Sequence, residues 1–258
     1  MHSKEVAIIV AGGKGLRLPG DLPKQFIEID GLPVLMHTLN AFRDYDASME
    51  IILVLPQADI SLWNELCRKH QFNHRITVVQ GGRSRFHSVQ NGLRHITDPG
   101  VVAVHDGVRP LITPGIIRAS FALARKCRSA VASVPLKESI RGLEGSAAGI
   151  PTTAASPEDV SKEGPAAHGS SGDLSSQRSV ALDRTKFRLM QTPQTFDIAL
   201  LKSAYDSARG DSFTDDASVI EQAGHAVVLF DGSYENLKIT TPEDLIIAEA
   251  ILRARRKK

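Results

Sequence analysis

The sequence predicts an α/β fold: a doubly wound, mostly parallel, Rossmann-like sheet flanked by helices, with a projecting β-hairpin arm. Short runs of branched aliphatic residues alternate with amphipathic segments over the first 136 residues. Continuous apolar runs of this kind are typical of strands that are covered on both faces. Their alternation with helical segments favours a parallel sheet with crossover helices.

The individual elements of the first half follow from this alternation. Strands are predicted at residues 6–10, 51–55, 76–79, 101–105 and 130–136, and helices near residues 33–43, 58–70, 85–96 and 114–126. Thr113 is expected to cap the last of these helices, because a threonine before a proline is typical of a helix start. Ligands of such sheets bind at the carboxyl ends of the strands. The loops at 11–26, 81–88 and 105–110 are therefore expected to meet in one crevice.

The pattern changes at about residue 144, where a stretch rich in Gly, Ser, Ala, Pro and Thr begins. It contains no aromatic residue and buries too little apolar surface to offset its ordering entropy, so we interpret residues 144–178 as a flexible insertion. The flanking segments 137–143 and 179–184 are predicted as the two strands of the arm, which spans about 137–186. We expect a single domain over residues 1–258 that includes this arm.

Regular structure is predicted to resume at residues 187–196. A helix is expected at 197–209, where Ile198, Leu201, Tyr205 and Ala208 share one face. Thr214 is expected to cap a helix over 215–223, and residues 226–230 are predicted to form the last strand. Thr241 and Pro242 then open a closing helix whose first turn is acidic.

Composition excludes several classes of protein. The chain has 258 residues, of which 42% are hydrophobic, and this is enough for a full core. A net charge of +2 is too small to indicate nucleic-acid binding. Cys67 and Cys127 are far apart and outside any C-x-x-C pair, which argues against a zinc site and fits a reducing cytoplasm. No apolar stretch approaches ~18 residues and no signal peptide is visible, so we expect a cytoplasmic protein without membrane contact.

The stretch VAIIVAGGKGLRLPGDLPKQF (6–26) contains the first candidate site. Gly12, Gly13 and Gly15 allow the backbone to approach a ligand closely, so that successive N–H groups can surround a phosphate. With Arg17 and Lys24 the loop could hold a triphosphate and stabilise the charge that develops during phosphoryl or nucleotidyl transfer. It lacks the G-K-[ST] end of a Walker loop and the last glycine of a dinucleotide fingerprint. From these residues alone, a structural turn with two solvated charges stays open.

Further motifs make a resemblance specific. They are A-G-G-x-G-x-R (11–17), P-K-Q (23–25), G-G-x-x-R-x-x-S-V (81–89), V-H-D-x-x-R-P (104–110), T-P-Q-x-F (192–196), T-D-D-A-S (214–218) and N-x-K-I-T-x-P-E-D-L (236–245). In this order the chain resembles the sugar- and polyol-phosphate nucleotidyltransferases, and among them the 2-C-methyl-D-erythritol 4-phosphate cytidylyltransferase family of the non-mevalonate isoprenoid pathway. The resemblance covers the chain except for about 144–178.

The resemblance implies transfer of a cytidylyl group from CTP to methylerythritol phosphate, with release of pyrophosphate. A substrate phosphate oxygen would attack the α-phosphorus in line, with no covalent enzyme intermediate. Mg²⁺ is expected to bridge phosphate oxygens, so few protein ligands are needed. The resemblance also implies a homodimer in which the arm completes the neighbouring subunit's site.

The resemblance also assigns roles to individual residues. Arg17 and Lys24 match the transition-state stabilisers. The substrate-positioning residues are Asp106, Arg109, Ser139, Arg184, Thr214 and Lys238. The nucleotide-binding residues are Ala11, Gly12, Gly13, Gly15, Gly81, Gly82 and Ser88.

Simpler interpretations of these residues stay open from the sequence. Asp106 could be a turn carboxylate paired with Arg109, Ser88 a helix-start hydroxyl, and Arg184 a surface cation. His105 is interpreted as a structural histidine at a strand end.

Other functions also stay open. A cytidylyltransferase for another polyol phosphate, such as ribitol 5-phosphate, would use the same fold. A non-catalytic nucleotide-binding regulator would not need cations at the reacting phosphorus. A dinucleotide-dependent oxidoreductase is disfavoured by the incomplete glycine fingerprint.

Overall fold

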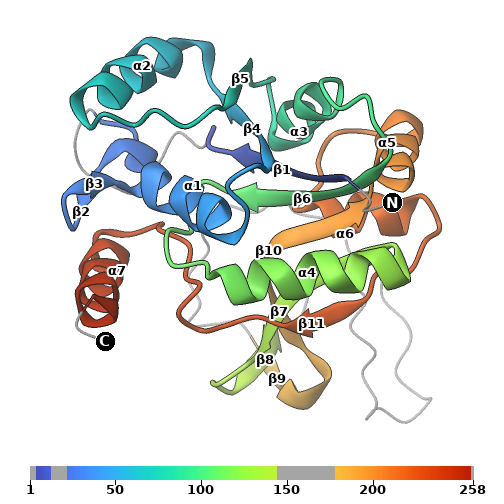
Figure 1. The fold of residues 1–258 in the computed structure, drawn as a ribbon. Coiled ribbons are helices and arrows are strands. Elements are labelled where there is room, and N and C mark those ends of the chain that lie inside the picture. The colour runs from blue at the N-terminus through green and yellow to red at the C-terminus, as the bar shows by residue number, and fades with distance from the viewer. Residues whose placement is uncertain (1–3, 13–21, 144–177, 257–258) are drawn as a thin grey trace, which may run out of the picture. The chain divides into compact units, whose positions relative to one another are not determined.

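A computed structural model describes residues 4–12, 22–143 and 178–256 (Figure 1). It divides into two compact units: Met1–Val134 with Met190–Lys258, and Pro135–Leu189. The first unit contains the sheet and the seven α-helices of the described residues, and the second contains a short hairpin.

The first unit is built on a seven-stranded sheet of order β11-β7-β10-β6-β1-β4-β5. The strands are β1 (Lys4–Val10), β4 (Glu50–Leu55), β5 (Thr77–Gln80), β6 (Gly100–Asp106), β7 (Ser129–Pro135), β10 (Arg188–Asp197) and β11 (Leu229–Asp231). β1 runs parallel to β4 and β6, β4 parallel to β5, and β11 parallel to β7. β10 runs antiparallel to β6. The predicted mostly parallel sheet is confirmed.

Helices cover both faces of this sheet. They are α1 (Val34–Tyr45), α2 (Ile60–Lys69), α3 (Arg85–Leu93), α4 (Pro114–Cys127), α5 (Ile198–Ser207) and α6 (Asp216–Gln222). A further helix, α7 (Pro242–Arg255), packs in a separate cluster with Ile29 and Val34. Shorter elements are the 3-10 turns Lys24–Phe26 and Gln57–Asp59 and the strand pair β2 (Glu28–Ile29) and β3 (Leu32–Pro33). The four helices predicted between the early strands are all present, with ends that differ by a few residues.

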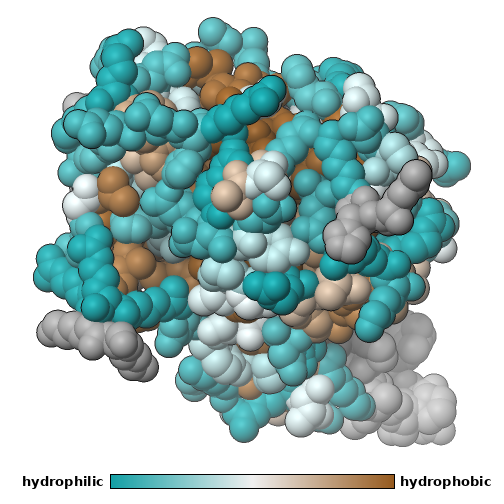
Figure 2. All heavy atoms as spheres, viewed as in Figure 1, coloured by the Kyte–Doolittle hydropathy of each residue, from teal (hydrophilic) through white to brown (hydrophobic). Residues whose placement is uncertain are grey.

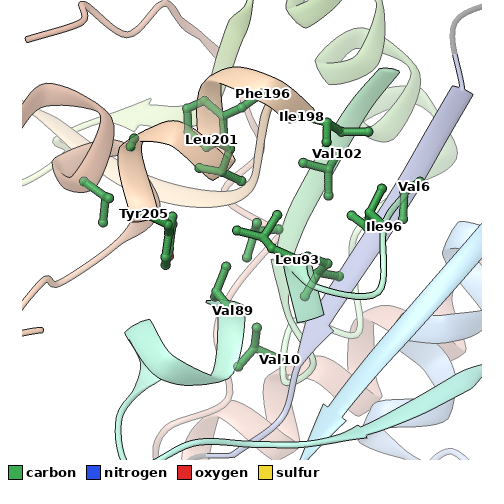
Figure 3. Close-up of a cluster of buried hydrophobic side chains, with 14 of the residues drawn as sticks. Val6, Val10, Val89, Leu93, Ile96, Val102, Phe196, Ile198, Leu201 and Tyr205 are labelled. Atoms are coloured by element: carbon green, nitrogen blue, oxygen red, sulfur yellow. The ribbon is translucent and has the colours of Figure 1, made fainter. Parts of the chain in front are cut away.

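Alternation along β1 shows why the sheet needs helices on both sides. Ala7 and Ile9 pack in one buried cluster with α1, α2 and α4. Val6, Ile8 and Val10 pack in another with α3, α5 and α6 (Figure 3). Each fully buried aliphatic side chain contributes about 1.5–3 kcal/mol relative to an exposed one. A strand that is apolar at every position is therefore stable only between two helical layers.

Helix caps confirm some predicted boundaries and correct others. Thr113 caps α4, where its side chain accepts a hydrogen bond from the Ile116 amide with Pro114 at the first helical position. The cap of α6 is Asp215 and not Thr214, because the Asp215 carboxylate accepts the Ser218 amide at 3.0 Å. Thr214 is exposed. Asp was the better candidate, since its carboxylate also interacts favourably with the helix dipole.

The last strand also differs from its prediction. β11 begins at Leu229, three residues after the predicted start at residue 226. The residue before it already pairs with β7, since the Val228 carbonyl accepts the Val131 amide at 2.8 Å.

The second unit contains the predicted pair of arm strands. β8 (Ile140–Leu143) and β9 (Ser179–Leu182) are antiparallel, with Ile140 opposite Leu182 and Leu143 opposite Ser179. The 3-10 turn Arg184–Lys186 follows. Nearly all of the predicted insertion, 144–177, lies outside the described residues.

The surface visible in Figure 2 is mostly hydrophilic, and hydrophobic residues appear there in several separate areas. Among the helices of the described residues, each is too short or too polar to cross a membrane.

Candidate active site

A cavity of about 900 Å³ lies where β1, β4, β5 and β6 end. Its walls combine Gly12 after β1, Pro56 after β4, Gly81 after β5, Asp106 at the end of β6, and Lys238 before α7. The carboxyl ends of the strands thus meet at one site, as expected for a doubly wound sheet.

One wall is the turn from β5 into α3. The Gly82 amide donates to Ser88 Oγ at 3.1 Å, and the Ser88 hydroxyl donates to the Ser84 carbonyl at 2.9 Å. A Cβ on Gly82 would lie 2.3 Å from the His87 Cβ, so only glycine fits there. The helix cap is Ser84, and Ser88 lies one turn further into α3. The serine hydroxyl therefore ties the glycine turn to the helix and is not the helix cap.

A second wall carries Lys24. This residue begins a 3-10 turn, and its ammonium donates to the Ile239 carbonyl at 3.1 Å, next to Lys238 in sequence. Gln25 follows and is buried, with its amide donating to Asp59 at 2.9 Å. Lys24, Gln25, Asp59 and Lys238 all line the cavity. Residues more than 200 positions apart are thus brought to one site.

Asp106 lies at the centre of a cluster of cations. Its Oδ2 is 3.0 Å from Lys238 Nζ and 3.4 Å from Arg109 Nε, and its Oδ1 is 3.9 Å from Arg85 Nε. Burial alone would raise the pKa of Asp106, but the three neighbouring cations outweigh it and hold the pKa well below its ordinary value. The carboxylate is charged at neutral pH. It pairs with Arg109, as the turn interpretation required, and also lines the cavity with Lys238.

Two residues of this site, Arg85 and Asp216, were missed in the sequence analysis. Arg85 lines the cavity, and its Nη2 is 2.6 Å from Oδ2 of Asp216, which is completely buried. Both lie inside motifs that the sequence shows, G-G-x-x-R-x-x-S-V and T-D-D-A-S. The spacing of the motifs could not reveal that the two side chains meet, because they are 131 positions apart.

His105 is fully buried behind Asp106. Burial lowers its pKa from the ordinary 6.5 to about 3, so the ring is neutral. Its Nδ1 is 3.0 Å from the Thr192 hydroxyl, and its Nε2 has no hydrogen-bond partner among the described residues. These contacts agree with a structural histidine.

The remaining predicted residues lie elsewhere. Gly13, Gly15 and Arg17 lie outside the described residues. Thr214 is not among the residues that line the cavity. Ser139 and Arg184 belong to the second unit, where Arg184 donates to the Lys137 carbonyl.

A metal ion would find few ligands in the described part of the chain. No group of three or more His, Cys, Asp or Glu side chains there could hold one. The carboxylates on the cavity wall are Asp59 and Asp106, and Asp106 is already surrounded by cations. Asp59 and Asp106 are oxygen donors of the type that Mg²⁺ prefers.

A glycine turn tied to a helix, beside cations that come from distant segments at the carboxyl edge of a parallel sheet, is typical of an α/β protein that binds a nucleotide. The chain belongs to the 2-C-methyl-D-erythritol 4-phosphate cytidylyltransferase family, which matches residues 5–155 and 173–254. The unmatched residues 156–172 lie inside the segment interpreted above as an insertion.

Relatives and solved structures agree with this family. The 2-C-methyl-D-erythritol 4-phosphate cytidylyltransferase of Bacteroides thetaiotaomicron is 46% identical over 249 residues, covering 96% of this chain and 100% of the relative. The Porphyromonas gingivalis enzyme of the same name is 42% identical, and the match covers 98% of this chain and 99% of the relative. The structure of 4-diphosphocytidyl-2C-methyl-D-erythritol synthase from Anaerococcus prevotii matches with a TM-score of 0.73 at 26% identity. The match covers 97% of this chain and 99% of that structure. The structure of 2-C-methyl-D-erythritol 4-phosphate cytidylyltransferase from Thermus thermophilus matches with a TM-score of 0.68 at 28% sequence identity. The match covers 98% of this chain and 100% of that structure.

Proposed function

We propose that this cavity performs the family's reaction, transfer of the cytidylyl group from CTP to 2-C-methyl-D-erythritol 4-phosphate in isoprenoid precursor synthesis. The observation that carries the proposal is the shared cavity: the Gly81–Gly82 turn, Lys24 and the Asp106–Lys238 pair line the same walls. A nucleotide and a second anion can therefore meet beside fixed positive charges.

The reaction needs positioning and charge stabilisation more than a reactive side chain. A phosphate oxygen of methylerythritol phosphate attacks the α-phosphorus of CTP, a new P–O bond forms, and the bond to pyrophosphate breaks. Negative charge accumulates at the five-coordinate phosphorus. Lys24 and Arg17 stabilise this charge, while Lys238, oriented by Asp106, positions the attacking phosphate.

Recognition of cytosine is assigned to the turn after β5. The Gly82 amide and the Ser84 carbonyl hold the Ser88 hydroxyl in one orientation. A fixed hydroxyl beside exposed backbone groups can distinguish the amino edge of cytosine from the carbonyl edge of uracil. Ala11 and Gly12 bring the backbone close to the nucleotide on the other side.

Magnesium is the proposed cofactor. Bound to the triphosphate, it would neutralise charge on the nonreacting phosphate oxygens. Removing divalent cations with EDTA should abolish turnover, and adding Mg²⁺ should restore it. Full turnover in EDTA would contradict this proposal.

The dimer is a proposal that rests on the family resemblance. Ser139 and Arg184 of the arm would then act in the neighbouring subunit's cavity. Lys24→Ala and Arg184→Ala proteins, each impaired alone, should regain part of the activity when mixed and allowed to exchange subunits. A mixture that stays inactive, or a monomer in sedimentation, would contradict the shared site. A cytoplasmic location remains a prediction from the two separate cysteines.

To test the activity, pyrophosphate release is measured with CTP, Mg²⁺ and each of several polyol phosphates in turn. Methylerythritol phosphate should give the highest kcat/KM, and ribitol 5-phosphate a much lower one. Preference for ribitol 5-phosphate would favour the alternative substrate, and CTP binding without turnover would favour a regulator.

The Lys24→Ala variant tests the catalytic assignment. It should lower kcat by roughly 10²-fold, the range for loss of one preorganised donor. Lys69→Ala is the control, because Lys69 pairs with Glu28 at the exposed end of α2 and does not line the cavity. An unchanged kcat for Lys24→Ala would refute the assignment.

A further inference from the structure

A chain of charged and polar groups runs from the hydrophobic core to the cavity. The Tyr205 hydroxyl donates to Oδ1 of Asp216 at 2.6 Å, and Arg85 Nη2 donates to Oδ2 of Asp216 at 2.6 Å. The same guanidinium has its Nε 3.9 Å from Oδ1 of Asp106. Asp106 then contacts Lys238 through its other oxygen. The four contacts connect α5, α6, α3, β6 and the segment before α7.

The inner end of this chain is rigid. Asp216 has no exposed surface, and its amide donates to Gln194 Oε1 at 3.0 Å. The Tyr205 ring stacks on Phe86 at 4.6 Å, within the hydrophobic cluster of Figure 3. A buried carboxylate costs several kcal/mol unless it is paired, so Arg85 is held firmly in this position.

The outer end of the chain is more exposed to solvent. The Lys238 side chain is 43% exposed, whereas that of Asp106 is 10% exposed. A carboxylate can rotate and offer either oxygen to a cation. Because Arg85 faces Oδ1, Oδ2 is left for Lys238 and Arg109. Arg85 and Arg109 thus face opposite oxygens of the carboxylate, and Lys238 lies against the oxygen that Arg85 leaves open.

We propose that Arg85, locked by Asp216 and Tyr205, is a positioning residue that fixes the Asp106 carboxylate and through it directs Lys238 at the methylerythritol phosphate. This inference rests on the proposed roles of Asp106 and Lys238. Arg85 acts through Asp106, so its loss affects the polyol phosphate step more than CTP binding.

The test avoids leaving a charge buried without a partner. Arg85→Gln alone would leave Asp216 unpaired, so the main variant is the neutral pair R85Q/D216N, in which two amides replace the ion pair. We expect kcat/KM for methylerythritol phosphate to fall on the order of 10²-fold, as for displacement of a reacting group by about 1 Å. The dissociation constant for CTP, measured by calorimetry, should change less than threefold. Arg94→Gln is the control, since Arg94 is exposed at the end of α3.

A double-mutant cycle with Asp106→Asn separates positioning from a general structural effect. If Arg85 acts through Asp106, R85Q/D216N should reduce kcat/KM by less than threefold in the Asp106→Asn background. Additive losses, or equal losses of CTP and methylerythritol phosphate binding, would overturn the inference.

The same variants distinguish failure of the inference from failure of the proposed function. If Asp106→Asn alone leaves kcat/KM unchanged, the proposed role of Asp106 is wrong, and the inference falls with it. If Asp106→Asn is impaired and R85Q/D216N is not, only the inference is wrong.

Discussion

His105 and Asp106 are neighbours in sequence but differ sharply in charge state. Both are buried at the end of β6. Asp106 stays ionised because three cations surround it, while His105 stays neutral because burial outweighs its one nearby carboxylate. The sequence shows two titratable side chains side by side, and the surrounding cations and core decide which one carries charge.

The neutral state of His105 predicts a pH dependence of stability. The folded pKa of about 3 lies below the ordinary 6.5, so the unfolded chain binds the proton first as the pH falls. His105 should therefore lower the free energy of unfolding by about 1.4 kcal/mol for each pH unit below 6.5, until about pH 3. Urea unfolding at pH 6.5 and pH 5.0 measures this loss. His105→Gln should reduce the loss by about 2 kcal/mol, and an equal loss in both proteins would contradict the buried neutral ring.

At the level of single elements, the start of α3 combines a cap, a glycine turn and a site residue. Ser84 caps the helix, Gly82 packs against its first turn, and Ser88 bonds back to the turn. The helix and the glycine turn, the proposed cytosine-recognition segment, are thus one structural unit, and we expect a substitution in either to alter the other.

Gly82→Ala tests this unit. The new Cβ would overlap the His87 Cβ and lie 2.9 Å from the His87 carbonyl carbon. We expect a loss of roughly 1–3 kcal/mol in the free energy of unfolding, the usual cost of overpacking. Gly12→Ala is the control, because the nearest atom to its Cβ would be 3.9 Å away, on Pro56. Equal melting temperatures for the two variants would contradict the close packing.

The start of α7 depends on one carboxylate. Oδ2 of Asp244 accepts the Thr240 amide, the Thr240 hydroxyl and the Thr241 amide, at 2.7–2.8 Å. Asp244→Ala should therefore cost about 1–2 kcal/mol in chemical unfolding. Glu243→Ala removes an acid from the same turn but keeps these three bonds, and it should cost less. A larger loss of stability for Glu243→Ala than for Asp244→Ala would contradict the capping role of Asp244.

At the scale of the whole molecule, every residue that lines the cavity lies in residues 10–134 or 190–258. Among the described residues of the second unit, 135–143 and 178–189, none is in this lining. We therefore expect CTP to bind to residues of the first unit.

Replacing residues 144–177 with a short Gly-Ser linker should leave the affinity for CTP unchanged. Loop-closure entropy changes slowly with loop length, so the strand pair β8–β9 should still form. Calorimetric titration with CTP compares the variant with the full chain. A large loss of affinity would mean that the replaced segment takes part in nucleotide binding.

Much of the fold was predictable because its signals are local. Continuous apolar runs predicted β1, β4, β5, β6 and β7, and a threonine before a proline predicted the start of α4. The cap of α6 was predicted one residue too early, because Thr214 and Asp215 can both cap a helix and the prediction chose the weaker of the two.

The sequence by itself determined the sheet, the family and the residue types of the site, because hydrophobic periodicity and motif order are written along the chain. Only the tertiary structure decided which charges meet. Asp106, Lys238, Arg85 and Asp216 come from distant segments, and their distances depend on how the sheet and helices pack. The partners of a charge, its burial and its protonation state are properties of three-dimensional neighbours, and a linear pattern does not encode them.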